Sequence, residues 1–312
     1  MIRFIIWRVV QLPLVLVVIY LITFGLVWLA PGDPFGNTER KLDPAAQKEL
    51  ENRFHANSWE SFLKYYPQQI LKRGDLGPSL SYPGWSVNDV LKYSFPVSMT
   101  LGLFAMGIAV VIGCVVGVTA SLHQKGLLDF FSLTIALIGI SLPSFVVAGL
   151  LLVVFSDWFH LLPSGGWGTF SRMILPGIAL ALMPMAYIAR LTRVSMLDTL
   201  GNDFVRTARA KGLSRQKVIW KHAFSNAFLP VFTYLGPATA YAITGSFVVE
   251  TVFNIPGLGV HFVNGVKNRD QTLILGTVLV YAAVLLTLNL IVDIGYALID
   301  PRIDVTARSN NN

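Results

Sequence analysis

Long apolar runs separated by short polar segments dominate the pattern along the chain. In the first run, Val9–Ala30, the only polar breaks are Gln11 and Thr23. At 1.5 Å per residue, a helix of this length crosses a hydrocarbon core of about 30 Å. The run is also longer than the apolar part of a secretory signal, and the following segment WLAPGDP offers no small-residue cleavage site. We therefore expect a transmembrane helix rather than a cleaved signal peptide.

Five further runs have a similar length and character. They predict an all-α polytopic membrane protein with six transmembrane helices in a single domain, residues 1–312. Proline interrupts two of the runs, at Pro143 and Pro184, and we expect both prolines to face protein or a cavity, where the freed carbonyls find donors. The five runs are Val97–Leu122, Phe130–Phe155, Ile174–Thr192, Ala227–Val249 and Leu273–Ile299.

Composition supports this assignment, and the distribution of charge orients it. Hydrophobic residues make up 54% of the chain, charged residues 13%, and the mean hydropathy is +0.61. The net charge of +7 would suit nucleic acid, but 13 of the 24 Lys and Arg residues lie at the two ends of the chain, in the loop 122–129 and in the stretch 190–222. This bias follows the positive-inside rule and places both termini in the cytoplasm. We expect a lipid bilayer as partner and no nucleic acid.

The same orientation divides the chain into parts. Residues 1–30 form the first helix, 31–96 an external loop with eight basic and eight acidic residues, 97–299 a five-helix core, and 300–312 a cytoplasmic tail. Within the external loop, Asp43 followed by Pro44 and, further on, Ser58 are typical of helix starts, so short helices are expected there. The core includes a cytoplasmic loop at 201–230.

Motifs for catalysis or for a resident cofactor are missing from the sequence. It has no G-x-x-x-x-G-K-[ST] phosphate loop, no H-E-x-x-H and no G-x-S-x-G. Its five histidines are scattered, and its single cysteine, Cys114, forms neither an internal disulfide nor a cysteine metal cage. The sequence thus predicts a protein that is not an enzyme and binds no metal or cofactor. Any uphill transport would draw its energy from another protein.

Two features inside the apolar runs suggest helix packing. Small residues recur every four positions in the second run, which lets another helix approach closely, within this chain or from another subunit; we favour the former. In the last run Asn289 and Asp293 share a helix face, and an ionisable group at that depth either pairs with a neighbouring helix or lines a wet path. The small residues are Ala105, Ala109, Gly113, Gly117 and Ser121.

The segment DFVRTARAKGLSRQKVIWKHAFSNAFLP, residues 203–230, is strongly basic in a largely apolar chain. Asp203 is expected to cap a short helix, and Gly212 to end it in the left-handed conformation. A second helix then begins at Ser214 and continues into the fifth span. Val205, Ala208 and Gly212 would form a shallow apolar face, flanked by cations that are available to a partner protein.

This segment resembles the EAA loop of binding-protein-dependent ABC importer permeases. The shared pattern is Thr207, Ala208 and Gly212, followed by Leu229 and Pro230. RTARAKGLS is similar to the B-type permease subunit of the oligopeptide, dipeptide and nickel importers. Further segments of that type cover nearly the whole chain: APGDP (30–34), GDLGPSL (74–80), ETVFNIPGLG (250–259), NRD (268–270) and NLIVDIGYALIDPRI (289–303).

The resemblance implies a type I ABC importer permease fold in the cell inner membrane. The implied partners are a homologous C-type permease subunit, two ABC ATPase subunits that bind ATP and magnesium, and an external substrate-binding protein. The implied ATPase-coupling residues are Val205, Arg206, Thr207, Ala208, Arg209, Ala210, Lys211, Gly212 and Leu213.

Two positions depart from the family pattern. Arg206 stands where the family has its glutamate, and RDQT replaces the more usual RDYP at residues 269–272. Short peptides are the expected cargo, with nickel chelates, sugars or opines as alternatives. An ion-gradient-driven transporter would need more intramembrane charges than Asp293, and a membrane-embedded enzyme would need a catalytic cluster.

Overall fold

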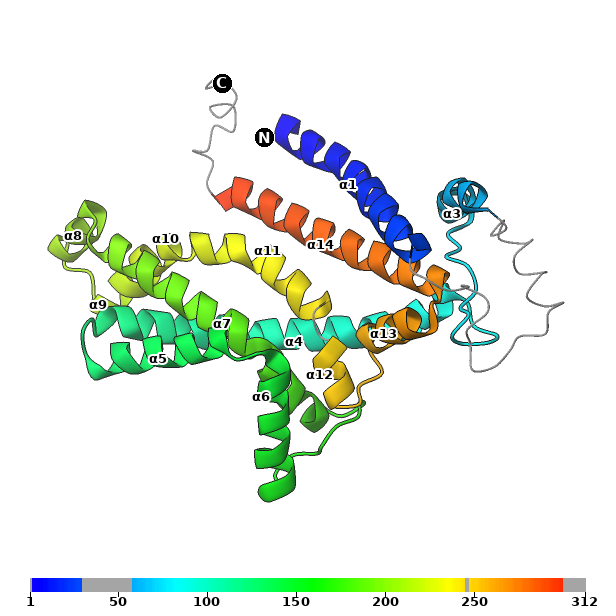
Figure 1. Ribbon diagram of the computed structural model, residues 1–312. Helices are drawn as coiled ribbons and strands as arrows, with labels where there is room; N and C mark the ends of the chain where they lie inside the picture. The colour runs from blue at the N-terminus through cyan, green and yellow to red at the C-terminus, as the bar shows by residue number, and fades with distance from the viewer. Residues whose placement is uncertain (1, 30–57, 245–246, 300–312) are drawn as a thin grey trace.

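The computed structural model describes residues 2–29, 58–244 and 247–299, and in these ranges every regular element is a helix. Their arrangement is elongated (Figure 1). The predicted helix at Asp43 and the tail 300–312 lie outside the described residues. Ser58 does cap a helix as expected: its hydroxyl accepts a hydrogen bond from the Ser61 amide at the start of α3, Trp59–Arg73.

The centre of the molecule is the pair α4, Val87–Leu122, and α7, Phe170–Leu200. The small-residue stripe of α4 lies in this contact: a Cβ added to Gly117 would lie 2.6 Å from the Ala189 carbonyl, and one added to Gly113 would lie 2.8 Å from that of Met185. All five stripe residues are buried. The expectation of a helix contact within one chain is therefore confirmed.

α4 begins well before the predicted start of the second span at Val97. The reason is a capping box at Ser86, whose hydroxyl accepts from the Asp89 amide while the Asp89 carboxylate accepts from the Ser86 amide. Each cap satisfies a backbone donor at the first turn and so favours helix formation there. The helix continues through Pro96, so α4 includes the last ten residues of the segment 31–96 that is predicted to lie outside.

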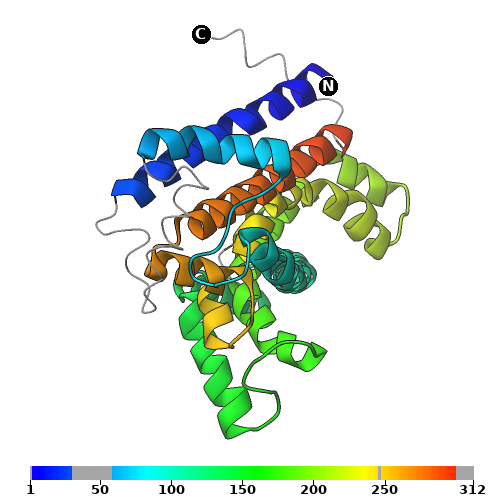
Figure 2. The same ribbon diagram turned by 90° about the vertical axis from the view of Figure 1, so that its right-hand side faces the viewer.

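The third predicted span, Phe130–Phe155, is bent rather than straight. α5, Leu127–Ser141, meets α6, Ser144–Leu151, and the π-helix η1, Leu152–Trp158, at 106°. Pro143 lacks an amide hydrogen and disfavours helical dihedrals at the preceding residue, and Leu142 is extended with φ −85° and ψ 125°. α6 consequently projects from the bundle (Figures 1 and 2).

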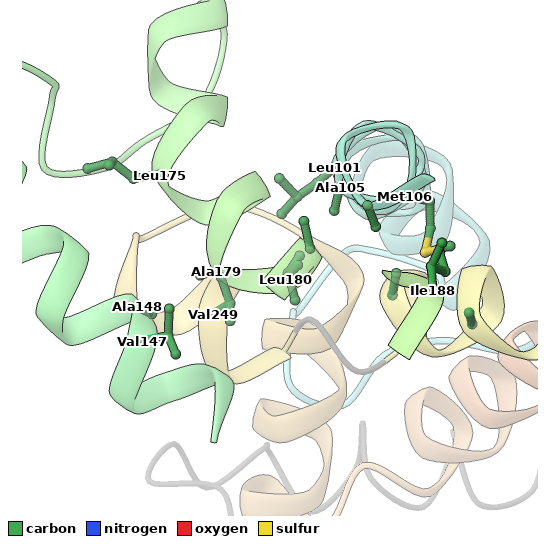
Figure 3. Packing of buried hydrophobic residues seen from close by; sticks show 14 of the residues in the cluster. Leu101, Ala105, Met106, Val147, Ala148, Leu175, Ala179, Leu180, Ile188 and Val249 are labelled. Atoms are coloured by element: carbon green, nitrogen blue, oxygen red, sulfur yellow. The ribbon is translucent and has the colours of Figure 1, made fainter. Parts of the chain in front are cut away.

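Near its first turn, α6 packs on the centre of the molecule through apolar side chains. Figure 3 shows Val147 and Ala148 of α6 near Ala179 of α7 and Val249 of α12, Phe247–Val252; all four are buried in one hydrophobic cluster. As expected, Pro184 lies buried in α7 and Pro143 lines a hollow beside α7.

A second layer consists of α1, Ile2–Leu29, beside α14, Gln271–Ile299 (Figures 1 and 2). α11, Leu229–Thr244, lies between α14 and α4, and α13, Leu258–Asn268, lies at the start of α14. Within the described residues, four helices are long and apolar enough to cross a membrane: α1, α4, α7 and α14. The bent pair provides a fifth candidate. α11 is short for a span by itself, so six transmembrane helices remain a prediction.

Candidate functional site

The basic segment forms a helical hairpin at one end of the molecule (Figure 1). Its first helix, α8, spans Asp203–Ala210, and Gly212 follows in the left-handed conformation with φ 76°, as expected. Asp203 is not the cap, which corrects the prediction: it is the first helical residue, and Asn202 occupies the cap position without a side-chain hydrogen bond. The carboxylate instead lies 3.5 Å from the Arg206 guanidinium.

The second helix of the hairpin begins after Ser214 and continues into α11, as predicted. It is composed of α9, Arg215–Lys217, the π-helix η2, Val218–Phe224, and α10, Ser225–Ala227. The amide of Phe228 donates to the Phe224 carbonyl and that of Phe232 to the Phe228 carbonyl, which joins α10 to α11. The second helix of the hairpin is therefore continuous with α11 of the core.

The apolar face of α8 is turned toward its own chain. Val205 is fully buried and Ala208 nearly so, and both pack on Val218 of η2, with Leu200 and Leu213 at the edge of the contact. These two side chains therefore contact their own chain and form no exposed apolar face, and their role in coupling stays a prediction. Their packing instead fixes the orientation of α8 relative to η2.

The outer face of α8 is polar, basic and uncovered. Thr207 and Ala210 lie on it among the cations, and Thr207 donates to the Asp203 carbonyl. Phe204, which the sequence analysis did not single out, adds an apolar side chain that is 43% exposed. Because neighbouring residues of a helix point in different directions, Phe204 cannot share the helix face of Val205. This sequence pattern could have identified Phe204 as exposed. The exposed basic residues here are Arg206, Arg209 and Lys211.

The hairpin rests on the two central helices. Ile219 and Ala223 of η2 pack against Val118 of α4 and Met196 of α7 in one buried cluster. Val218 contacts α8 and the next residue, Ile219, contacts the core, so η2 connects the two. Movement of α8 is thus connected by direct packing to α4 and α7.

An ion pair that the sequence analysis missed lies nearby. Arg193 of α7 donates from Nε and Nη2 to the two carboxylate oxygens of Asp129 at the start of α5, at 2.5 and 2.8 Å. The Asp129 side chain is 5% exposed. The acidic Asp129 at the start of an apolar run could have indicated an ion pair. The sequence did not identify its partner, because Arg193 lies far along the chain. The pair connects α5 to α7 at the hairpin end of both helices.

Asn289 and Asp293 lie far from the hairpin in sequence and on a different helix. Asp293 accepts a salt bridge from Arg8 of α1, with Nε 3.1 Å from Oδ2. Asn289 faces α11 at Gly236, and its buried Oδ1 has no hydrogen-bond partner among the described residues. Of the two roles left open for this face, the geometry favours pairing between helices.

Toward the opposite end of the molecule, the motif segments ETVFNIPGLG and NRD each contain a buried carboxylate. Glu250 of α12 accepts from the Ser98 hydroxyl at 2.6 Å and from the Gly259 amide at 3.0 Å. A Cβ at Gly257 would collide with this carboxylate, which explains the glycine in ETVFNIPGLG. Both carboxylates hold the chain in place. Asp270 accepts from Ser79 Oγ, the Ser81 amide, Thr272 Oγ1 and the Leu273 amide.

A histidine at this end contacts a tyrosine hydroxyl. His261 Nδ1 lies 2.8 Å from the Tyr82 hydroxyl, which also accepts from the Asn264 amide. Burial lowers the pKa of His261, so the neutral ring is favoured. Within the described ranges, no group of three or more His, Cys, Asp or Glu side chains could hold a metal ion.

Comparison with known proteins agrees with this architecture. Residues 109–305 match the family model "Binding-protein-dependent transport system inner membrane component". The dipeptide transport system permease protein DppB of Bacillus subtilis is 44% identical over 97% of this chain and 98% of its own length. The oligopeptide transport system permease protein OppB of Escherichia coli K12 is 44% identical over 97% and 99%.

A solved structure shares the fold. A chain of the MetNI methionine ABC transporter in an inward-facing conformation aligns with a TM-score of 0.56 and 17% identity, over 68% of this chain and 96% of that one. The match with the family model and the near-full-length relatives lead to one conclusion. The chain belongs to the family of binding-protein-dependent transport system inner membrane components.

Proposed function

We propose that the protein is one of two permease subunits of an ATP-driven importer of short peptides. The observation that carries this proposal is its similarity, over nearly its whole length, to a dipeptide and an oligopeptide permease. Those names favour peptides over nickel chelates, sugars or opines. The second permease would be a homologous C-type subunit. Both permeases would lie in the inner membrane, and an external binding protein would deliver the peptide to them.

ATP hydrolysis would be performed by two separate ATPase subunits that bind ATP and magnesium. The coupling surface would be the outer face of α8, with Phe204 as an apolar anchor among the cations. Val205 and Ala208 would act indirectly, because they fix α8 on η2 and thereby on α4 and α7. In this arrangement a push on α8 moves the central helices rather than the hairpin alone.

The test is to purify the chain with its partner subunits and to compare two double charge reversals. Arg206→Glu with Arg209→Glu should shed the ATPase subunits and abolish peptide uptake. The matched control, Lys72→Glu with Arg73→Glu at the end of α3, changes net charge equally but lies at the other end of the molecule (Figure 1). It should retain the ATPase subunits.

The chain by itself should hydrolyse no ATP, and hydrolysis should appear with the partners. Hydrolysis by the pure isolated chain would contradict the division of labour. Full ATPase retention and uptake in the Arg206/Arg209 variant would contradict the coupling surface. Uptake of nickel chelates or sugars, without uptake of peptides, would contradict the cargo.

A further inference from the structure

The bend between α5 and α6 borders a hollow on the flank of α7. This hollow has a volume of about 190 Å³, and its walls come from the bend, from α7 and from Tyr241 of α11. Ser141 and Ser144 flank the break, where Leu142 and Pro143 interrupt the helix. The residues that line the hollow include no Asp, Glu, Lys or Arg.

Three tyrosines form a group beside this hollow. Tyr187 of α7 and Tyr234 of α11 pack with ring centroids 4.4 Å apart, and Tyr234 lies within electrostatic reach of both Tyr187 and Tyr241. Tyr187 is 42% and Tyr241 49% exposed. Met183, one turn before Tyr187 on α7, is 42% exposed and lines the hollow as well. Tyr187 and Tyr241 are therefore uncovered, whereas Tyr234 is partly buried against the central hydrophobic cluster.

The position of these rings argues against contact with lipid. They fall within the runs 174–192 and 227–249 that are expected to span the membrane, where hydrocarbon offers no hydrogen-bond partner for a hydroxyl. Tyrosines of an interfacial belt lie at one depth. Tyr234 and Tyr241 instead lie seven residues apart on one helix, which is about 10 Å along its axis. The group thus forms a row that runs along the helix.

The chemistry of the row fits a particular ligand. Phenol hydroxyls donate and accept hydrogen bonds, and their rings provide apolar contact area. Main-chain amides of an extended peptide need both a donor and an acceptor at each residue. Because no charged side chain lines the hollow, such a surface would accept peptides regardless of the charge of their side chains.

We propose that Tyr187, Tyr234 and Tyr241, together with the wall formed by the α5–α6 bend, line the translocation path and bind the main chain of the passing peptide. The inference rests on the proposed function and adds the place of contact and its chemistry. It differs from a path along Asn289 and Asp293, since Asp293 is paired with Arg8 of α1. The competing occupants are lipid and the second permease subunit.

The first experiment removes the hydroxyls and keeps the rings. A triple variant with Tyr187→Phe, Tyr234→Phe and Tyr241→Phe is assembled with its partner subunits in proteoliposomes. Uptake of an uncharged tripeptide should fall at least fivefold, with unchanged subunit content and unchanged basal ATPase activity. The matched control is Tyr93→Phe, at an exposed tyrosine of α4 outside the row; its uptake should equal that of the wild type.

The second experiment measures water access. Tyr241→Cys in a Cys114→Ser background should react with a small hydrophilic thiol reagent, and a transported peptide should slow that reaction. Val111→Cys, on the exposed flank of α4, should not respond to peptide. An unreactive Cys at 241 would indicate lipid or a subunit contact and would overturn the assignment.

The two proposals fail in different ways. Absence of peptide uptake by the wild-type complex would overturn the proposed function and this assignment with it. Normal wild-type uptake, with unchanged uptake in the triple variant and no peptide protection at position 241, would overturn this assignment alone.

Discussion

At the residue scale, backbone conformation or burial determines the role of a few residues. Gly212 has positive φ, and no atom lies within 4 Å of a Cβ built there. Only the backbone conformation restricts this position. His261 of α13 contacts the Tyr82 hydroxyl, and burial lowers the pKa of its ring. A substitution at Gly212 therefore tests the backbone conformation, and one at His261 tests the protonation of a buried ring.

Replacing Gly212 should act through φ alone. Gly212→Val should cost roughly 1–3 kcal/mol at the turn, because a β-branched residue disfavours the left-handed region. Gly212→Asn should cost much less, since asparagine tolerates that region. We expect peptide uptake and stimulated ATPase activity to fall for Val and to stay near wild type for Asn, at equal abundance in the membrane. Equal loss in both variants would mean that bulk, not backbone conformation, matters.

Acidification should loosen the contact of α13 with Tyr82. Because the folded pKa of His261 lies below its unfolded value, the unfolded chain binds the extra proton more readily. Stability from this residue is intact above the unfolded pKa, about 6.5, and falls as the pH drops through and below it. Thermal unfolding of the purified complex should thus be more acid-sensitive in the wild type than in His261→Gln. An identical pH dependence would refute this role.

At the element scale, close approach of helices fixes the core. α4 and α7 meet along small residues, and the Arg193–Asp129 ion pair joins α7 to α5 at one end. Pro143 turns α6 away from α5 and so opens the flank of α7. The hairpin α8–η2 is held to this framework by apolar packing rather than by its many charges.

Two glycines of α4 allow a matched test of this packing. A Cβ at Gly117 would approach the Ala189 carbonyl and Thr192, whereas one at Gly107 would meet nothing within 4 Å. Gly117→Ala should lower the stability of the complex by about 1–3 kcal/mol through overpacking. Gly107→Ala should be neutral or stabilising by a few tenths, from helix propensity. Thermal unfolding followed by fluorescence-detected size exclusion would compare them, and equal shifts would contradict the α4–α7 contact.

At the scale of the whole molecule, the basic hairpin and the helices α3 and α13 lie at opposite ends (Figure 1). α8 lies at one end, toward which the N-terminal end of α1 and the C-terminal end of α14 also point, while α3 and α13 lie at the other (Figure 1). This arrangement agrees with the charge bias that places the hairpin and both chain ends in the cytoplasm.

Labelling from one side of the membrane would test this topology. In a Cys114→Ser background, a cysteine at Leu71, 86% exposed on α3, should react with an impermeant thiol reagent in intact cells. A cysteine at Gln216, exposed at the start of the second hairpin helix, should react only after the membrane is opened. The reverse pattern would invert the orientation.

The sequence by itself determined the apolar helices, the turn at Gly212, the start of α3 at Ser58 and the family. These depend on local periodicity, capping and backbone sterics, which act over a few residues. Only the tertiary structure decided that Val205 and Ala208 are covered by Val218, that Asp129 meets Arg193, and that Asp293 meets Arg8. Such contacts join residues far apart in sequence, and their geometry depends on how whole helices pack, which no local pattern encodes.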